Sequence, residues 1–75
     1  MKDYNNVLGN RLKQMIGFNR LTHKELADRI GIAPALLSQY MSGKRGMRVT
    51  VLVQICKVLN VSSDYLLGLS DKVEL

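Results

Sequence analysis

Two features of the sequence predict an all-α fold, and a third predicts its size. Over several short stretches, apolar residues recur at the three- and four-residue spacing of a helix face. Runs in which β-branched residues alternate with polar ones are few, which argues against a β-sandwich or a β-barrel. The chain has 75 residues, of which 47% are hydrophobic, so we expect one small domain at most, with a compact core.

The first predicted helix covers residues 5–19. Its apolar stripe consists of Leu8, Leu12, Met15 and Ile16. The polar face includes Arg11 and Lys13, and two alternatives are open for these cations. They either solvate the helix or contact a phosphate group.

The second predicted helix, residues 22–31, has both of its ends marked. Thr22 and Glu25 have the spacing of a capping box, in which each side chain accepts a hydrogen bond from the other residue's backbone N–H. Gly31 can adopt the left-handed conformation that ends a helix. Leu26, Ala27 and Ile30 form its predicted buried side.

The third predicted helix begins at Pro34, where a missing N–H costs nothing, and stops at Gly43. We expect Leu37 and Tyr40 to face inward. The short turn "GIA" before this helix, with the small Ala27 preceding it, allows the second and third helices to pack closely. A pair of this kind projects its second helix outward, where it fits the major groove of B-DNA, about 12 Å wide.

Residues 49–60 are rich in Val, so a strand is the competing interpretation. We favour a helix because the stretch is long for a strand and has helical periodicity. The predicted apolar face is Val49, Leu52, Ile55, Cys56 and Leu59, and Asn60 is a plausible left-handed terminator.

A last short helix is predicted over residues 62–69, capped by Ser62 or Ser63. Asp64 lies in its first turn, where the helix dipole favours an acid. We expect residues 1–69 to form the domain. The tail, residues 70–75, is expected to be loose unless it pairs with a partner.

The formal charge of +5 is unevenly distributed. Residues 1–50 carry nine Lys or Arg and three Asp or Glu, whereas residues 51–75 carry two and three. This asymmetry suggests one face for an anionic partner.

Several classes of protein are excluded by what the sequence lacks. Cys56 is the only cysteine, so there is no internal disulfide and no thiolate zinc site, and its apolar neighbours predict a buried thiol. His23, the only histidine, has no triad partner, and phosphate-loop, dinucleotide and metalloprotease motifs are absent. We therefore predict no enzyme, metal, cofactor, small-molecule substrate or membrane span, and a cytoplasmic location.

Two stretches resemble the XRE/Cro-type helix-turn-helix family of phage and bacterial repressors: residues 11–45, "RLKQMIGFNRLTHKELADRIGIAPALLSQYMSGKR", and residues 52–68, "LVQICKVLNVSSDYLLG". The similarity extends from about residue 8 to residue 68. It implies a compact five-helix bundle of the lambda-repressor-like class, with its helix-turn-helix at helices 2 and 3. It also implies binding to double-stranded operator DNA, usually as a homodimer.

The same resemblance assigns roles to individual residues. Those matching the family's base readers are Ala33, Pro34, Ala35, Ser38 and Gln39. Those expected to contact phosphates are Thr22, His23, Lys24, Lys44, Arg45 and Arg48. For His23 the alternatives are an exposed residue at a helix start and a pH-dependent phosphate contact. Neutralising about six phosphates would give a slope near −5 in a plot of log binding constant against log salt concentration.

This chain departs from the family pattern at two places. Relatives commonly carry polar residues where Ala33, Pro34 and Ala35 stand. Gln39 is therefore expected to be the main polar reader, worth about 1–3 kcal/mol of base discrimination, with groove shape and dimer spacing supplying the rest. Many relatives also pair an Arg with a Glu at the positions of Ile16 and Met41, and we expect an apolar pair to replace that ion pair here.

Several alternatives are open at this stage. The apolar start of the third helix is also compatible with a protein-interaction module. Among regulators, the options are a prophage repressor, a restriction–modification controller and an antitoxin-like autoregulator, and the chain is also compatible with the amino-terminal piece of a longer repressor. An exposed residue among Tyr65, Leu66, Leu67 and Leu69 is the expected dimer surface, unless that cluster packs onto the first helix.

Overall fold

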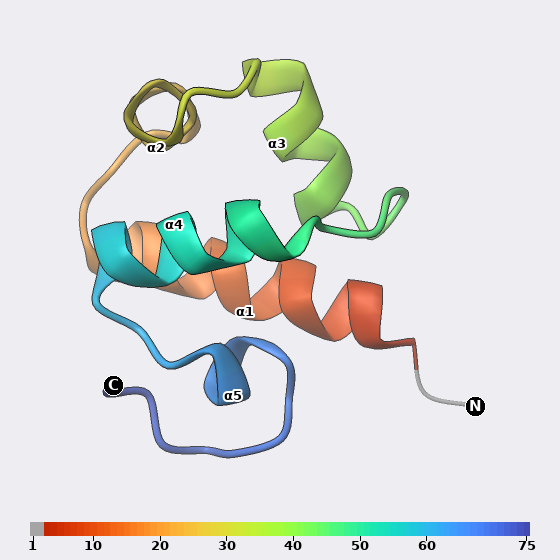
Figure 1. Cartoon of the computed structure of the whole chain (residues 1–75), viewed down its shortest axis with the longest axis vertical. Coiled ribbons are helices and arrows are strands. Elements are labelled where there is room, and N and C mark those ends of the chain that lie inside the picture. Colours follow the sequence, from red (N-terminus) through yellow and green to blue (C-terminus); the bar gives the residue numbers. More distant parts are fainter. Residues whose placement is uncertain (1–2) are drawn as a thin grey trace.

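The computed structural model describes residues 3–75, and within this range it contains five helices and no strand. The helices are α1 (Tyr4–Phe18), α2 (His23–Ile30), α3 (Pro34–Met41), α4 (Val49–Leu59) and α5 (Ser63–Leu66) (Figure 1). The prediction of an all-α five-helix bundle is confirmed, including the helical assignment of the Val-rich segment. None of the helices described is long and apolar enough to cross a membrane.

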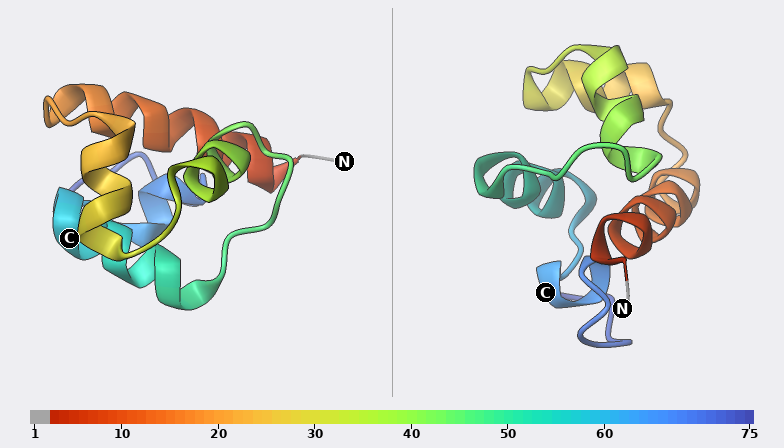
Figure 2. Two further views of the ribbon diagram at one scale, coloured as in Figure 1. Left: turned by 90° about the horizontal axis from the view of Figure 1, so that it is seen from above. Right: turned by 90° about the vertical axis from the view of Figure 1, so that its right-hand side faces the viewer.

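The helices enclose one apolar core. In Figure 2, α1 and α4 lie on opposite sides of the molecule, α2 and α3 cover one end, and α5 closes the other. Each helix contributes at least one large side chain with no exposed surface: Leu12, Leu26, Leu37, Ile55 and Leu66. Complete burial of a Leu or Ile side chain stabilises a fold by about 1.5–3 kcal/mol, so every helix is held by the same core.

The helix ends follow the signals in the sequence. Thr22 Oγ1 accepts from the Glu25 N–H at 3.1 Å, and Glu25 Oε1 accepts from the Thr22 N–H at 3.0 Å, which completes the capping box. Gly31 ends α2 with a φ of 75°, and Asn60 ends α4 with a φ of 54°. Ser62 is the residue that caps α5.

The crossing of α1 over α3 depends on Gly9. This residue is buried, and a Cβ atom added to it would collide with the Met41 carbonyl oxygen. Ile16 and Met41 are each 3% exposed and belong to the same core. Both residues of the expected apolar pair are therefore buried. Burial of both is what we expect where apolar packing takes the place of an ion pair.

One prediction of burial is wrong. Val49, assigned to the apolar face of α4, is 75% exposed, whereas Val51 is buried. The buried row runs through Val51, Ile55 and Leu59, with Cys56 beside it. Val49 is the first residue of α4, so its side chain projects from the end of the helix and not into the core.

Burial also raises the pKa of the Cys56 thiol by desolvation, as expected for a structural cysteine.

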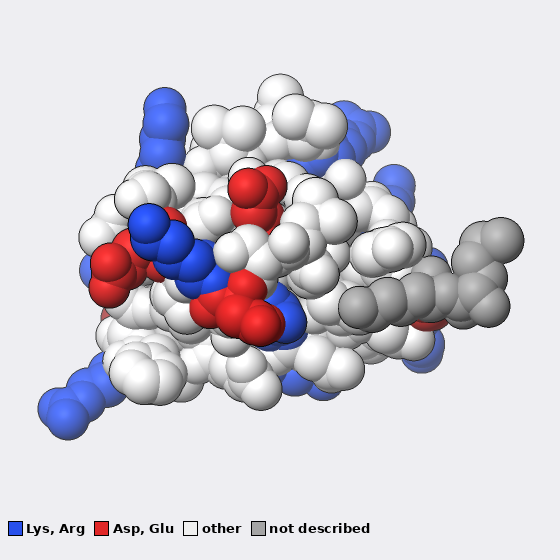
Figure 3. Space-filling model, turned by 90° about the horizontal axis from the view of Figure 1, so that it is seen from below, with Lys and Arg blue, Asp and Glu red and all other residues white. Residues whose placement is uncertain are grey.

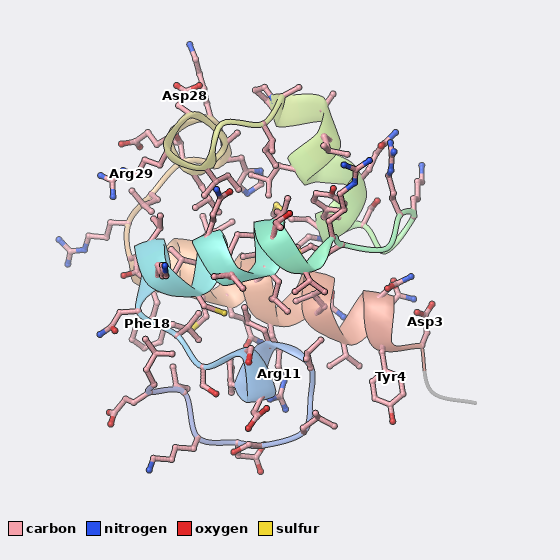
Figure 4. The ribbon with its side chains drawn as sticks, viewed as in Figure 1. Asp3, Tyr4, Arg11, Phe18, Asp28 and Arg29 are labelled. Atoms are coloured by element: carbon pink, nitrogen blue, oxygen red, sulfur yellow. The ribbon has the colours of Figure 1, made fainter. Side chains whose placement is uncertain are left out.

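The tail, which we expected to be loose unless it pairs with a partner, contacts the helices in the structure. Ser62 donates its N–H to the Val73 carbonyl at 2.7 Å, and the Val73 side chain packs against the core. Arg11 of α1 reaches the same segment, since its Nη1 donates to the carbonyls of Tyr65 at 2.6 Å and Ser70 at 2.8 Å (Figure 4). Its guanidinium also lies 4.4 Å from the Tyr65 ring centroid.

Arg11 therefore has a structural role. Its Nη2 pairs with Asp71 at 3.3 Å, and its side chain is only 24% exposed. Because its guanidinium joins α1 to α5 and the tail, this structural role is favoured over contact with a phosphate. Lys13, two residues further along α1, is exposed and forms no ion pair within residues 3–75.

Candidate nucleic-acid interface

Helices α2 and α3 are joined by a tight turn. The Ile32 N–H donates to the Ala27 carbonyl at 3.0 Å, and Gly31 supplies the left-handed backbone at the bend. Ala27 and Leu37 are fully buried, which allows the two helices to pack closely. The predicted geometry of a helix pair with an outward second helix is confirmed.

The outer surface of α3 consists of the residues that we predicted to read bases. Ala33, Pro34, Ala35, Ser38 and Gln39 are all exposed. Leu37, Tyr40 and Met41 take the inner side, and Leu36 is half-buried between the two sides. Within residues 3–75 the Gln39 side-chain amide has no hydrogen-bond partner, so both its donor and its acceptor are available to a ligand.

The basic loop, residues 42–48, follows α3 directly. The Lys44 N–H donates to the Gln39 carbonyl at 3.1 Å, which holds the loop against the end of α3. Nitrogen-tipped side chains project outward from this loop in Figure 4. Lys44, Arg45 and Arg48 are exposed, and none of them pairs with a carboxylate in the described part of the chain. Their charge is therefore free to meet an anion.

The start of α2 lies in the same helix pair. The Thr22 N–H is occupied by Glu25, but the backbone N–H groups of His23 and Lys24 donate to no other group of residues 3–75. Free N–H groups at a helix start favour an anion. The hydrogen bond from the Thr22 backbone N–H to the Glu25 carboxylate is the main reason why the pKa of Glu25 lies below its ordinary value.

The face formed by α5 and the tail has a different character. These segments carry Asp64, Asp71 and Glu74, all exposed. Figure 3, which views the molecule from below the orientation of Figure 1, shows acidic side chains at the left and near the middle of this face, with a basic side chain lying between them. Because like charges repel, these carboxylates disfavour a polyanion at this face. The basic loop beside α3 contains no Asp or Glu.

Two hollows were not foreseen from the sequence. The larger, of about 450 Å³, is lined by Gln14, Met15, Phe18, Tyr65 and Val73 and contains no charged side chain. The smaller, of about 150 Å³, is lined by Lys13, His23, Ser38, Met41 and Ser42, from α1, α2 and α3. Sequence reasoning missed the second because its members lie on three helices and share no motif.

The fold and this surface define a helix-turn-helix protein. A family model described as helix-turn-helix matches residues 19–66. The chain belongs to this family, of the XRE type, whose members include transcriptional regulators.

Curated relatives from Bacillus subtilis (strain 168) support the assignment. The chain is 36% identical over 61 residues to the uncharacterized HTH-type transcriptional regulator YobD, covering 81% of this chain and 54% of that protein. It is 38% identical over 61 residues to the HTH-type transcriptional regulator ImmR, covering 81% and 48%. The chain thus spans about half the length of these relatives.

Solved structures agree on the fold. The clp gene regulator ClgR from Corynebacterium glutamicum matches with a TM-score of 0.81 and 25% identity, covering 87% of this chain and 69% of that one. The restriction–modification controller protein C.AhdI from Aeromonas hydrophila matches with a TM-score of 0.77, covering 83% of this chain and 94% of that one. At 18% identity, the second match supports the fold alone.

Proposed function

We propose that this protein is a sequence-specific regulator of transcription that inserts α3 into the major groove of DNA and represses by occupying a promoter. The observation that carries the proposal is the exposed outer surface of α3 beside a loop of unpaired cations. The α3 surface presents methyl and methylene groups and one free amide to base edges. The cations Lys44, Arg45 and Arg48 contact phosphates, as do His23 and Lys24 at the start of α2. We propose that the protein acts by binding and not by catalysis. Because its proposed target is DNA, we also propose a cytoplasmic location.

Gln39 is the proposed polar reader of this surface. Its amide suits the N6 and N7 atoms of adenine, and such a bidentate pair is worth about 1–3 kcal/mol of discrimination. Binding-site selection with the natural protein and with Gln39→Ala tests this role. We expect the variant to lose preference at one position of each half-site and to keep the others. An unchanged preference at every position would show that Gln39 does not read bases.

A homodimer is the proposed binding unit. Specific DNA binding generally exceeds non-specific binding by about 4–10 kcal/mol, which one amide and a few methyl contacts in a single half-site do not supply. Leu69 is 67% exposed, and its N–H donates to the Asp64 carbonyl at 2.8 Å, which fixes it beside α5. We propose Leu69 as part of the dimer surface.

Sedimentation and footprinting test the dimer. Leu69→Asp should shift the protein toward monomer and remove one of two footprints spaced about one DNA turn apart. Val53→Asp is the matched control, because Val53 is an exposed apolar residue of α4, at 45% exposure. If both variants sediment as the natural protein does, Leu69 does not form the interface.

The alternative is a protein-interaction module that uses the apolar start of α3. Gel-shift assays with genomic fragments separate the two functions. A regulator retains a preferred fragment in the presence of excess competitor DNA, whereas an interaction module retains none. The unpaired cations beside α3 favour the regulator.

A further inference from the structure

The start of α3 has no polar side chain. Ala33, Pro34 and Ala35 are exposed, and the flanking Ile32 and Leu36 are half-buried. Figure 1 shows this end of α3 at the top edge of the molecule. Ala33 is the N-cap and makes no side-chain hydrogen bond, whereas the N-cap side chains of α1, α2 and α5 do. A Ser or Asp there would stabilise the helix, so the apolar surface is present at a cost in stability.

This apolar surface continues into the basic loop. Lys44, Arg45 and Arg48 are exposed and pair with no carboxylate within residues 3–75. The bond from the Lys44 N–H to the Gln39 carbonyl, 3.1 Å long, fixes the loop to the same helix. An apolar protein partner would satisfy the start of α3 alone. A DNA duplex satisfies both parts, because its phosphates face the cations while the groove receives the helix start.

The major groove offers one apolar group to such a surface. Purines and cytosine present nitrogen and oxygen atoms there, whereas thymine adds a methyl group on C5. An Ala methyl or a Pro ring placed against a polar atom removes water and returns no hydrogen bond, which weakens binding. Against a methyl group, the same surface gains from burial. An apolar helix start therefore favours a pyrimidine with a methyl group on C5.

We propose that the start of α3 recognises the C5-methyl group of pyrimidines, with Pro34 and Ala35 as the contact residues. The inference rests on the proposed function and deepens it, because it names the chemical group that is recognised in the operator. It also extends beyond thymine, since 5-methylcytosine has the same methyl group at the same ring position. Methylation of a cytosine that faces Pro34 or Ala35 therefore strengthens binding.

Helical spacing relates the methyl group to the adenine proposed for Gln39. Ala35 and Gln39 are both exposed and lie four residues apart, so they share one row of α3. They are separated by about one helical turn, or about 5.4 Å along the axis. Neighbouring base pairs are about 3.4 Å apart. The methyl-bearing pyrimidine is therefore expected within about two base pairs of that adenine.

Replacement of thymine by uracil tests the methyl contact, because it removes the methyl group and keeps the base pair. Each thymine of the duplex obtained by binding-site selection is replaced in turn, and affinity is measured by fluorescence anisotropy. Burial of one methyl group corresponds to about a fourfold change in binding constant, so we expect a loss of this size at one or two thymines per half-site. The proposal is overturned if no replacement weakens binding by more than about twofold, or if the selected half-site contains only G·C pairs.

Serine variants test the assignment to α3. Pro34→Ser and Ala35→Ser place a hydroxyl on the exposed start of the helix, and a thermal melt confirms that each variant folds. At least one of them should bind the thymine and uracil duplexes with equal affinity, because a hydroxyl beside the methyl group removes the gain from burial. Val53→Ser is the matched control on α4, where Val53 is 45% exposed, and it should retain the difference. An undiminished difference in all three variants would overturn the assignment.

Cytosine methylation tests the extension beyond thymine. A duplex in which the sensitive T·A pair is replaced by C·G should bind more weakly, and a methyl group on C5 of that cytosine should raise the affinity about fourfold. Methylation of a cytosine outside the half-sites should have no effect. Unchanged affinity at the sensitive position would overturn the proposal, while selective binding to the duplex would still support the proposed function. A protein that binds no duplex would refute the proposed function and, with it, the methyl contact.

Discussion

The basic loop offers the sharpest quantitative prediction. Lys44 and Arg45 are exposed, unpaired and held next to α3, so each is expected to neutralise one phosphate. Each contact contributes about −0.9 to the log–log slope of affinity against salt. The double variant Lys44→Gln/Arg45→Gln should therefore have a slope about 1.8 smaller in magnitude than the natural value near −5. Over a fourfold increase in salt, these two contacts account for about a twelvefold loss of affinity.

Fluorescence anisotropy with a labelled duplex, repeated at several salt concentrations, measures this slope. The matched control is Lys57→Gln/Lys72→Gln, which removes the same charge from α4 and the tail. We expect the control to keep the natural slope, because these two cations lie outside the proposed interface. Equal reductions in the two double variants would show that overall charge alone sets the affinity, and would refute the assignment of the loop.

Three further predictions concern the folded state. Met41→Glu introduces an unpaired carboxylate at a site that is 3% exposed, and should lower the free energy of unfolding by about 3–5 kcal/mol; an unchanged thermal midpoint would refute the apolar pair. Arg11→Gln removes two hydrogen bonds to backbone carbonyls and should lower the free energy of unfolding in urea by about 1.5–3 kcal/mol. The control Lys13→Gln should leave the unfolding midpoint unchanged. Equal losses of stability in the two variants would contradict the structural role of Arg11. The lowered pKa of Glu25 means that its stabilisation is complete above pH 4.5 and is lost as the pH falls through the folded-state value. Acid melts should therefore show a steeper loss for the natural protein than for Glu25→Gln, and parallel curves would count against the capping box.

The helices were predictable because their signals are local. The capping box of α2, the glycine that ends it and the proline that begins α3 each act within a few residues, and the structure has all three. The turn between α2 and α3 also follows from local residues. The exposed side of α3 could therefore be predicted from the sequence. Because Leu37 and Tyr40 face the core, the opposite side of the helix faces solvent.

The register of α4 was harder to predict. Val, Leu or Ile occupies so many positions of this helix that periodicity alone favours no single face. Packing chooses the row through Val51 and leaves Val49 exposed. The choice depends on how α4 meets α2 and α5, which is a property of the tertiary structure.

Contacts between distant segments were not predictable from patterns. Arg11 donates to carbonyls 54 and 59 residues further along the chain, and any residue has a carbonyl, so no side-chain motif marks the acceptor. The Gly9 crossing depends in the same way on the Met41 backbone. The hollow lined by Lys13, His23 and Ser38 forms only after α1, α2 and α3 have packed together.

The most direct test of the central claim is a titration of ¹⁵N-labelled protein with a DNA duplex, followed by amide chemical shifts. The account predicts that the largest shifts occur at residues 22–24, 33–39 and 44–48, with small changes in α5 and the tail. Shifts concentrated on the acidic face of α5 and the tail, or no shifts at all, would contradict the proposal that α3 enters the groove with the basic loop on the phosphates.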